Sequence, residues 1–157
     1  MERYEKKFKR LLSEMAFSKS QIESEIRSSN RNRTQHLLKC SYMPENTSYN
    51  HWLQEIYTDL DDIQQMKWKR RNKHFSKERY FENLWEMPFE NKDDYEIIDS
   101  YMEDLIYQNY KIPEDWKLKK NIFIKNLKHF YWEISELLSL NKLSRMVVYD
   151  LIKRHFK

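Results

Sequence analysis

Apolar side chains recur every three or four residues along most of this chain, the spacing that places them on one face of an α-helix. The pattern predicts helices over about residues 3–15, 19–43, 52–63, 76–85, 95–106, 122–138 and 143–151. The strongest stripe is Trp52, Leu53, Ile56, Tyr57, Leu60 and Ile63. We therefore expect an all-α protein, a compact helical bundle of five to seven helices.

Polar residues and prolines predict where these helices begin and end. Thr47 or Ser48 can cap the third helix and Asn91 the fifth. Prolines at positions 44, 88 and 113 close three segments, because proline lacks the amide that a helix interior requires. The apolar residues expected to face inward in the last three helices are Tyr95, Ile98, Met102, Leu105, Ile106, Ile122, Phe123, Leu127, Phe130, Tyr131, Ile134, Leu137, Leu138, Leu143, Met146, Val147 and Leu151.

One predicted helix is interrupted by a wholly polar stretch, residues 28–33. Such a stretch fits three arrangements. It can face solvent, break the helix, or form a polar site inside the bundle. The sequence leaves all three open.

Composition narrows the fold and the chemistry. A chain of 157 residues suits one domain, and we expect residues 1–157 to form a single helical domain. Aromatic residues make up 15% of the chain, which favours a packed core over disorder. Glycine is absent. Its absence excludes phosphate-binding loops, dinucleotide fingerprints and nucleophile elbows, which need glycine for backbone conformation or close approach.

Cysteine content and hydropathy indicate a reducing, cytoplasmic setting. Cys40 is the one cysteine, and no apolar run is long enough for a signal peptide or membrane span. His36 and Cys40 lie one helical turn apart, but no second pair at ligand spacing accompanies them. Neither a metal nor a cofactor is expected.

Charge is distributed unevenly. The net charge is +4, but residues 78–104 contain ten acids and two bases, a local charge of −8, so the remainder carries +12. This segregation fits either internal pairing of opposite charges or a basic surface for an anionic partner. The ridge Glu78, Glu82 and Glu86 likewise fits pairing with bases in the fold or contact with a basic partner.

A candidate catalytic pattern is Arg31, Asn32 and, four residues further on, His36. It resembles the Arg-Asn-x-x-x-His signature of HEPN ribonucleases, which pair an arginine and a histidine across a dimer and cut RNA without metal. The resemblance implies that His36 transfers protons and Arg31 stabilises phosphate charge. The alternative is an ordinary polar helix face.

A second resemblance begins at the same histidine. His36, Leu37, Leu38 and Lys39, followed by a proline turn and Trp52, resemble the bacterial domain of unknown function 29 family over roughly residues 21–66. Members carry a histidine-leucine-leucine-lysine segment, a proline turn and a tryptophan in this order. The family is helical and has no established activity, so this resemblance implies a structural role for His36.

The basic stretch around Trp68 is typical of a nucleic-acid contact, with cations for phosphates and a ring for base stacking. Further bases follow at 117, 119, 120, 125 and 128. A solvated helix terminus is the alternative. The candidate nucleic-acid-binding residues are Lys67, Trp68, Lys69, Arg70, Arg71 and Lys73.

These observations favour binding over catalysis. We expect a non-catalytic helical module that contacts nucleic acid or a nucleoprotein complex, with a protein partner as a further option and no membrane. A small regulator carried by a mobile element, such as an inhibitor of a nucleic-acid-targeting defence complex, fits the size and the charge segregation. The alternative is a metal-independent HEPN-like ribonuclease that uses Arg31 and His36. The sequence does not indicate the oligomeric state.

Overall fold

The computed structural model describes residues 19–65 and 94–156, and these residues form an all-helical protein without strands. The predicted helices near residues 3–15 and 76–85 lie outside the described residues. The elements are α2 (Lys19–Tyr42), α3 (Tyr49–Gln64), α5 (Asp94–Tyr107), the 3-10 helix η3 (Glu114–Lys119), α6 (Lys120–Ser139) and α7 (Arg145–His155). The all-α fold class is therefore confirmed.

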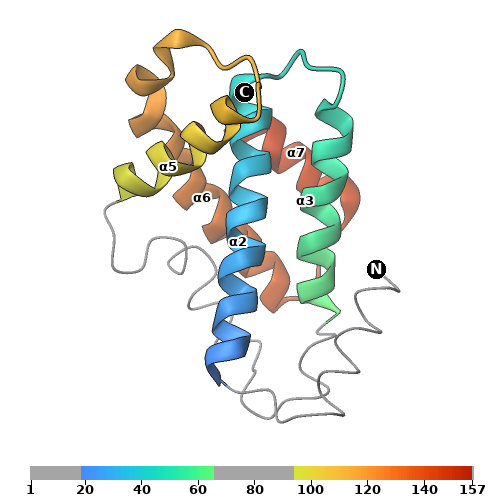
Figure 1. Ribbon diagram of the computed structural model, residues 1–157. Coiled ribbons are helices and arrows are strands. Elements are labelled where there is room, and N and C mark those ends of the chain that lie inside the picture. The colour runs from blue at the N-terminus through green and yellow to red at the C-terminus, as the bar shows by residue number, and fades with distance from the viewer. Residues whose placement is uncertain (1–18, 66–93, 157) are drawn as a thin grey trace.

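The helices form two layers. Helices α2 and α3 make a hairpin at the front of Figure 1, α6 and α7 lie behind them, and α5 crosses at one side. The polar stretch 28–33 lies in the middle of α2 and does not break it. None of the helices that the structure describes combines the length and the apolar character needed to span a membrane.

The turn between α2 and α3 follows the predicted proline position. Pro44 lies directly after Met43, whose amide still bonds to the Lys39 carbonyl at 2.8 Å. Ser48 occupies the N-cap position of α3, but its side chain makes no capping hydrogen bond. The Asn46 side chain instead accepts a hydrogen bond from the Ser48 amide at 2.8 Å. An Asx turn thus organises the start of α3.

Two of the described helices are followed by a left-handed asparagine, in a chain that contains no glycine. Asn109 after α5 and Asn141 after α6 have φ angles of 67° and 56°, in the left-handed region. Asparagine is the usual substitute for glycine at this position. The Tyr110 amide bonds back to the Leu105 carbonyl at 3.1 Å, which closes the Schellman motif of α5. The predicted range 95–106 agrees with α5, and Pro113 separates this segment from η3.

Every described helix contributes to one apolar core. The fully buried apolar side chains are Leu37, Leu38, Cys40, Ile56, Leu60, Ile98, Met102, Leu127, Phe130, Tyr131, Ile134, Leu138, Val148 and Ile152.

Four residues predicted to face inward are instead exposed: Tyr95, Ile106, Ile122 and Met146. They lie at the margins of their stripes, because each helix meets its neighbours over only part of its apolar face. Ile122 illustrates this, since the adjacent Phe123 is buried and Ile122 points outward.

Candidate functional site

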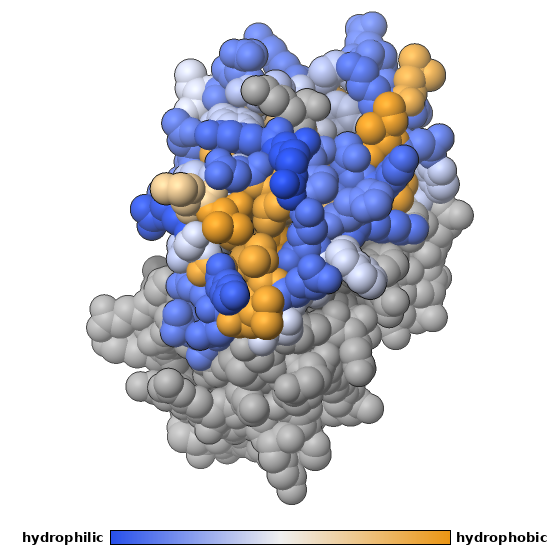
Figure 2. All heavy atoms as spheres, turned by 180° about the vertical axis from the view of Figure 1, so that it is seen from behind, coloured by the Kyte–Doolittle hydropathy of each residue, from blue (hydrophilic) through white to orange (hydrophobic). Residues whose placement is uncertain are grey.

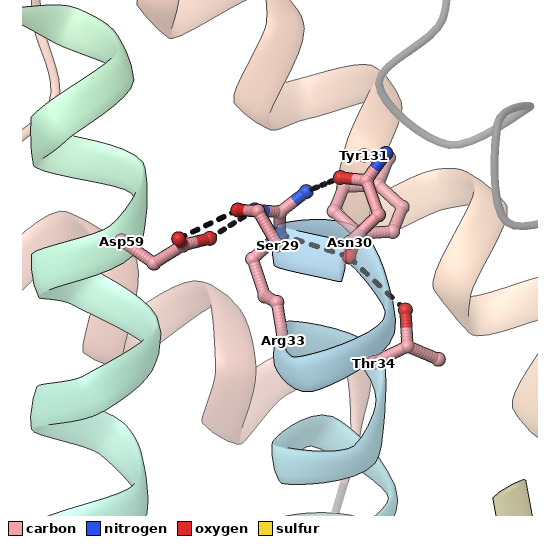
Figure 3. A network of polar contacts seen from close by, with 6 residues as sticks. All are labelled: Ser29, Asn30, Arg33, Thr34, Asp59 and Tyr131. Carbon is pink, nitrogen blue, oxygen red and sulfur yellow. Dashed lines mark hydrogen bonds and ion pairs between the residues drawn. The ribbon is translucent and has the colours of Figure 1, made fainter. Parts of the chain in front are cut away.

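The polar stretch of α2 forms a polar site inside the bundle, one of the three arrangements that the sequence leaves open. Asn30 and Thr34 are fully buried, and Arg33 is 1% exposed. Arg31 and Asn32 between them are exposed, because a helix turns by about 100° per residue. Figure 3 shows the side chain of Arg33 meeting Asp59 of α3 and Tyr131 of α6.

Arg33 is the centre of this buried polar cluster, which we define as Ser29, Asn30, Arg33, Thr34, Asp59 and Tyr131. Its Nε donates to the Tyr131 hydroxyl at 3.0 Å. Its Nη1 forms an ion pair with the Asp59 carboxylate, and its Nη2 donates to Asn30 Oδ1. The Ser29 hydroxyl donates to the other Asp59 oxygen at 2.7 Å. A buried guanidinium needs such partners, because losing water costs several kcal/mol per ion.

Within and next to this cluster, three buried polar atoms of α2 have no hydrogen-bond partner in the described part of the chain. They are Asn30 Nδ2, Gln35 Nε2 and His36 Nδ1. Burial lowers the pKa of His36 from 6.5 to about 4, with the charges of Lys39 and His51 adding to the effect. His36 is therefore neutral at pH 7.

The candidate catalytic residues Arg31 and His36 point in different directions. Arg31 pairs with Asp104 of α5 and lies over the Tyr101 ring, 5.7 Å from its centroid. His36 is half-buried on the side toward α3. Five residues of α-helix separate the two directions by about 140°. One chain does not bring the pair together, so the ribonuclease prediction requires a second chain.

The segment that resembles the domain of unknown function 29 family lies in the core between α2 and α3. Leu37 and Leu38 are fully buried, and Trp52 is nearly so. The Lys39 ammonium lies 4.5 Å from the Tyr110 ring centroid and 5.7 Å from that of Trp52. This cation–π contact partly offsets the cost of burying the ammonium group. These residues have structural roles in this fold.

Cys40, which follows Lys39 in this segment, is fully buried. Burial raises the pKa of its thiol to about 12, despite the opposing effect of the Lys39 charge. A protonated thiol is neither a nucleophile nor a metal ligand. Among the described residues, no three His, Cys, Asp or Glu side chains gather as a metal site.

The basic residues after Pro113 separate into two groups. Lys120 faces inward, where it pairs with Asp99 of α5 at 2.7 Å and lies over the Tyr95 ring. Lys117, Lys119, Lys125 and Lys128 are exposed. The other predicted nucleic-acid-binding residues, 67–71 and 73, lie outside the described residues, as does the ridge of Glu78, Glu82 and Glu86.

The outer side of α6 combines cations with a large exposed ring. We define the α6 basic face as Ile122, Lys125, Lys128, His129 and Trp132, all of which are exposed. At 100° per residue they fall within an arc of about 120°, and the exposed Glu136 falls within the same arc at the end of α6. Figure 2 looks onto the side that carries α6 and α7, and shows polar residues over most of the described surface with apolar strips between them.

Protein-family models, curated proteins and solved structures contain no match to this chain. Both family resemblances therefore stay predictions, and the site is described from its own residues.

Sequence reasoning missed Trp132. The helical pattern leaves it off the buried stripe, while its neighbours Phe130 and Tyr131 are on it. A tryptophan seven residues after Lys125, on the same helical face, was the available signal.

Proposed function

We propose that the protein is a non-catalytic helical module that binds nucleic acid, free or within a nucleoprotein complex, through the α6 basic face. The observation that carries this proposal is the charge of residues 117–132, which contain five lysines, one histidine and no acid. Four of those lysines are exposed. Such a surface attracts a polyanion and releases its counterions.

Charge segregation in the chain supports the same surface. Helix α5 carries acids and no bases. Two of these acids pair inside the fold, Asp99 with Lys120 and Asp104 with Arg31. Lys119 also pairs within the chain, with Asp115 at 3.5 Å, so internal pairing involves two lysines of the basic segment. Lys125 lies exposed on the outer side of α6. Internal pairing of opposite charges therefore explains part of the charge segregation. A basic surface for an anionic partner explains the exposed lysine.

A regulatory role is compatible with the positions of Arg31 and His36, which point in different directions on α2. A small protein that covers phosphates on a target, or on a complex that holds nucleic acid, can compete with another protein without chemistry. This is the role of a small regulator carried by a mobile element, for example an inhibitor of a nucleic-acid-targeting defence complex.

Reversing two charges on the face tests the binding. We expect Lys125→Glu with Lys128→Glu to weaken binding of a labelled oligonucleotide at least about tenfold at 50 mM salt, because two phosphate contacts become repulsive. The slope of log affinity against log salt should fall by about two. Fluorescence anisotropy over a salt series measures both quantities.

The matched control is Lys142→Glu with Arg145→Glu, at the connection between α6 and α7, which changes the net charge equally. The end of α6 at Ser139 lies about 21 Å along the helix axis from Lys125. An equal loss of affinity in both variants would show that only total charge matters and would remove the α6 basic face from the proposal. Charge reversal of Arg70 and Arg71 tests the other basic stretch in the same assay.

The alternative function, a metal-independent ribonuclease, makes a separate prediction. Cleavage of labelled RNA in the presence of a chelator should be lost in His36→Ala if Arg31 and His36 are catalytic. The Asp104 partner of Arg31 and the neutral state of His36 at pH 7 favour binding instead. A wild-type protein that leaves RNA intact at all concentrations would rule out the ribonuclease.

A further inference from the structure

We infer that the α6 basic face selects single-stranded nucleic acid, with the Trp132 indole as a platform on which one base stacks. This inference rests on the proposed function and specifies its ligand. Trp132 is 67% exposed, whereas the other tryptophans that the structure describes, Trp52 and Trp116, are buried. A ring that packs in the core elsewhere in this protein is here presented to solvent.

The surroundings of Trp132 suit a nucleotide. Lys128 lies one turn before it on the same face, and Lys125 lies two turns before it, about 10 Å along the helix axis. A base on the indole therefore has a flanking phosphate within reach of the Lys125 ammonium. His129 lies beside them on the same arc.

Two acids lie near this arrangement. Glu136 is exposed one turn after Trp132 and falls within the arc of the α6 basic face, so it lowers the positive charge on that side of the ring. Glu133 follows Trp132, but its carboxylate turns toward α7, where Arg154 and His155 contact it at 2.6 and 2.7 Å. Burial alone would raise the pKa of Glu133, but the hydrogen bonds from His155 and Arg154 outweigh it and lower the pKa. Its negative charge is thus held between two side chains of α7, away from the lysines.

Stacking distinguishes single strands from duplexes. In a duplex both faces of each base are covered by its neighbours, so an indole has no base to stack on without opening the helix. In a single strand the base is free to stack, which contributes about 1–3 kcal/mol, roughly five- to a hundredfold in affinity. Phosphate contacts alone would not make this distinction.

An anionic membrane surface is the competing ligand, since exposed Leu118 and Ile122 accompany the lysines. A helix that lies in a lipid interface presents a continuous apolar stripe below its basic residues. On the α6 basic face the apolar residues Ile122 and Trp132 are instead separated by Lys125, Lys128 and His129. Interleaved rings and cations are typical of single-strand binding.

The test uses the full chain, a labelled 20-nucleotide single strand, the matching duplex, and vesicles containing phosphatidylserine. We expect Trp132→Ala to weaken single-strand binding roughly tenfold and duplex binding less than twofold, and Trp132→Phe to retain most of the single-strand affinity. Met146→Ala, which removes another exposed apolar side chain, is the control and should change neither. Circular dichroism confirms that each variant is folded.

Each other outcome overturns the inference. Equal losses for single strand and duplex in Trp132→Ala, or no loss in either, would reject stacking while the charge-reversal result keeps the proposed function. Wild-type protein that binds vesicles and neither oligonucleotide would reject both the inference and the proposed function.

Discussion

Asp59→Ala is expected to lower the free energy of unfolding by about 3–5 kcal/mol. The substitution removes the carboxylate with which the buried Arg33 guanidinium forms an ion pair. It also removes the acceptor of the Ser29 hydroxyl. Urea denaturation followed by far-ultraviolet circular dichroism measures the change.

The control for this prediction is the other arginine–aspartate pair of α2. Asp104→Ala breaks the contact with Arg31, whose side chain is 52% exposed, and should cost less than about 1 kcal/mol. A double-mutant cycle with Arg33→Met and Asp59→Ala then isolates the buried pair. We expect Asp59→Ala to cost much less in the Arg33→Met background than in the wild type, because Arg33→Met has already removed the buried positive charge. Equal costs at Asp59 and Asp104 would contradict a buried, compensated Arg33.

Acidification from pH 6.5 to 4 is expected to destabilise the protein by about 3 kcal/mol through His36 alone. The pKa of His36 is about 4 in the folded chain and 6.5 in the absence of burial. In this interval the unfolded chain binds a proton that the folded chain does not bind. Stability therefore falls as the pH falls through this window, and below pH 4 both states are protonated and His36 adds no further loss.

His36→Gln separates this effect from other titrations. The variant should show a flatter dependence of unfolding free energy on pH between 6.5 and 4 than the wild type. Glu133, whose pKa is lowered from 4.5 by its α7 partners against the opposing effect of burial, begins to lose its contribution at the acid end of this window and loses the rest below it. Parallel curves for wild type and His36→Gln across the window would show that His36 is accessible to water in the folded protein.

Much of the helical architecture follows from local patterns. The stripe from Trp52 to Ile63 predicts α3 almost to its ends, and Pro44 predicts the turn before it. Ser144 caps α7 by accepting a hydrogen bond from the Val147 amide at 3.3 Å. The predicted range 95–106 likewise matches α5, which ends just before the left-handed residue Asn109.

The candidate site was less predictable. Lysines at 125 and 128 are recognisable as a basic segment, but Lys120 has the same residue type and lies in an ion pair with Asp99. Trp132 and Trp116 are also the same residue type, and only the packing of α6 and η3 against the bundle exposes one and buries the other. Composition cannot distinguish them, because exposure depends on which neighbours a helix meets.

Spacing, proline positions and the absence of glycine were enough to establish a helical protein and to exclude glycine-dependent chemistry, because these properties act over a few residues of chain. Only the tertiary structure placed the polar stretch 28–33 inside the bundle. The partners that make this burial tolerable, Asp59 and Tyr131, are 26 and 98 residues from Arg33 in sequence. No local pattern contains a contact over that separation, so the folded bundle decides whether a charged side chain is solvated or buried and paired.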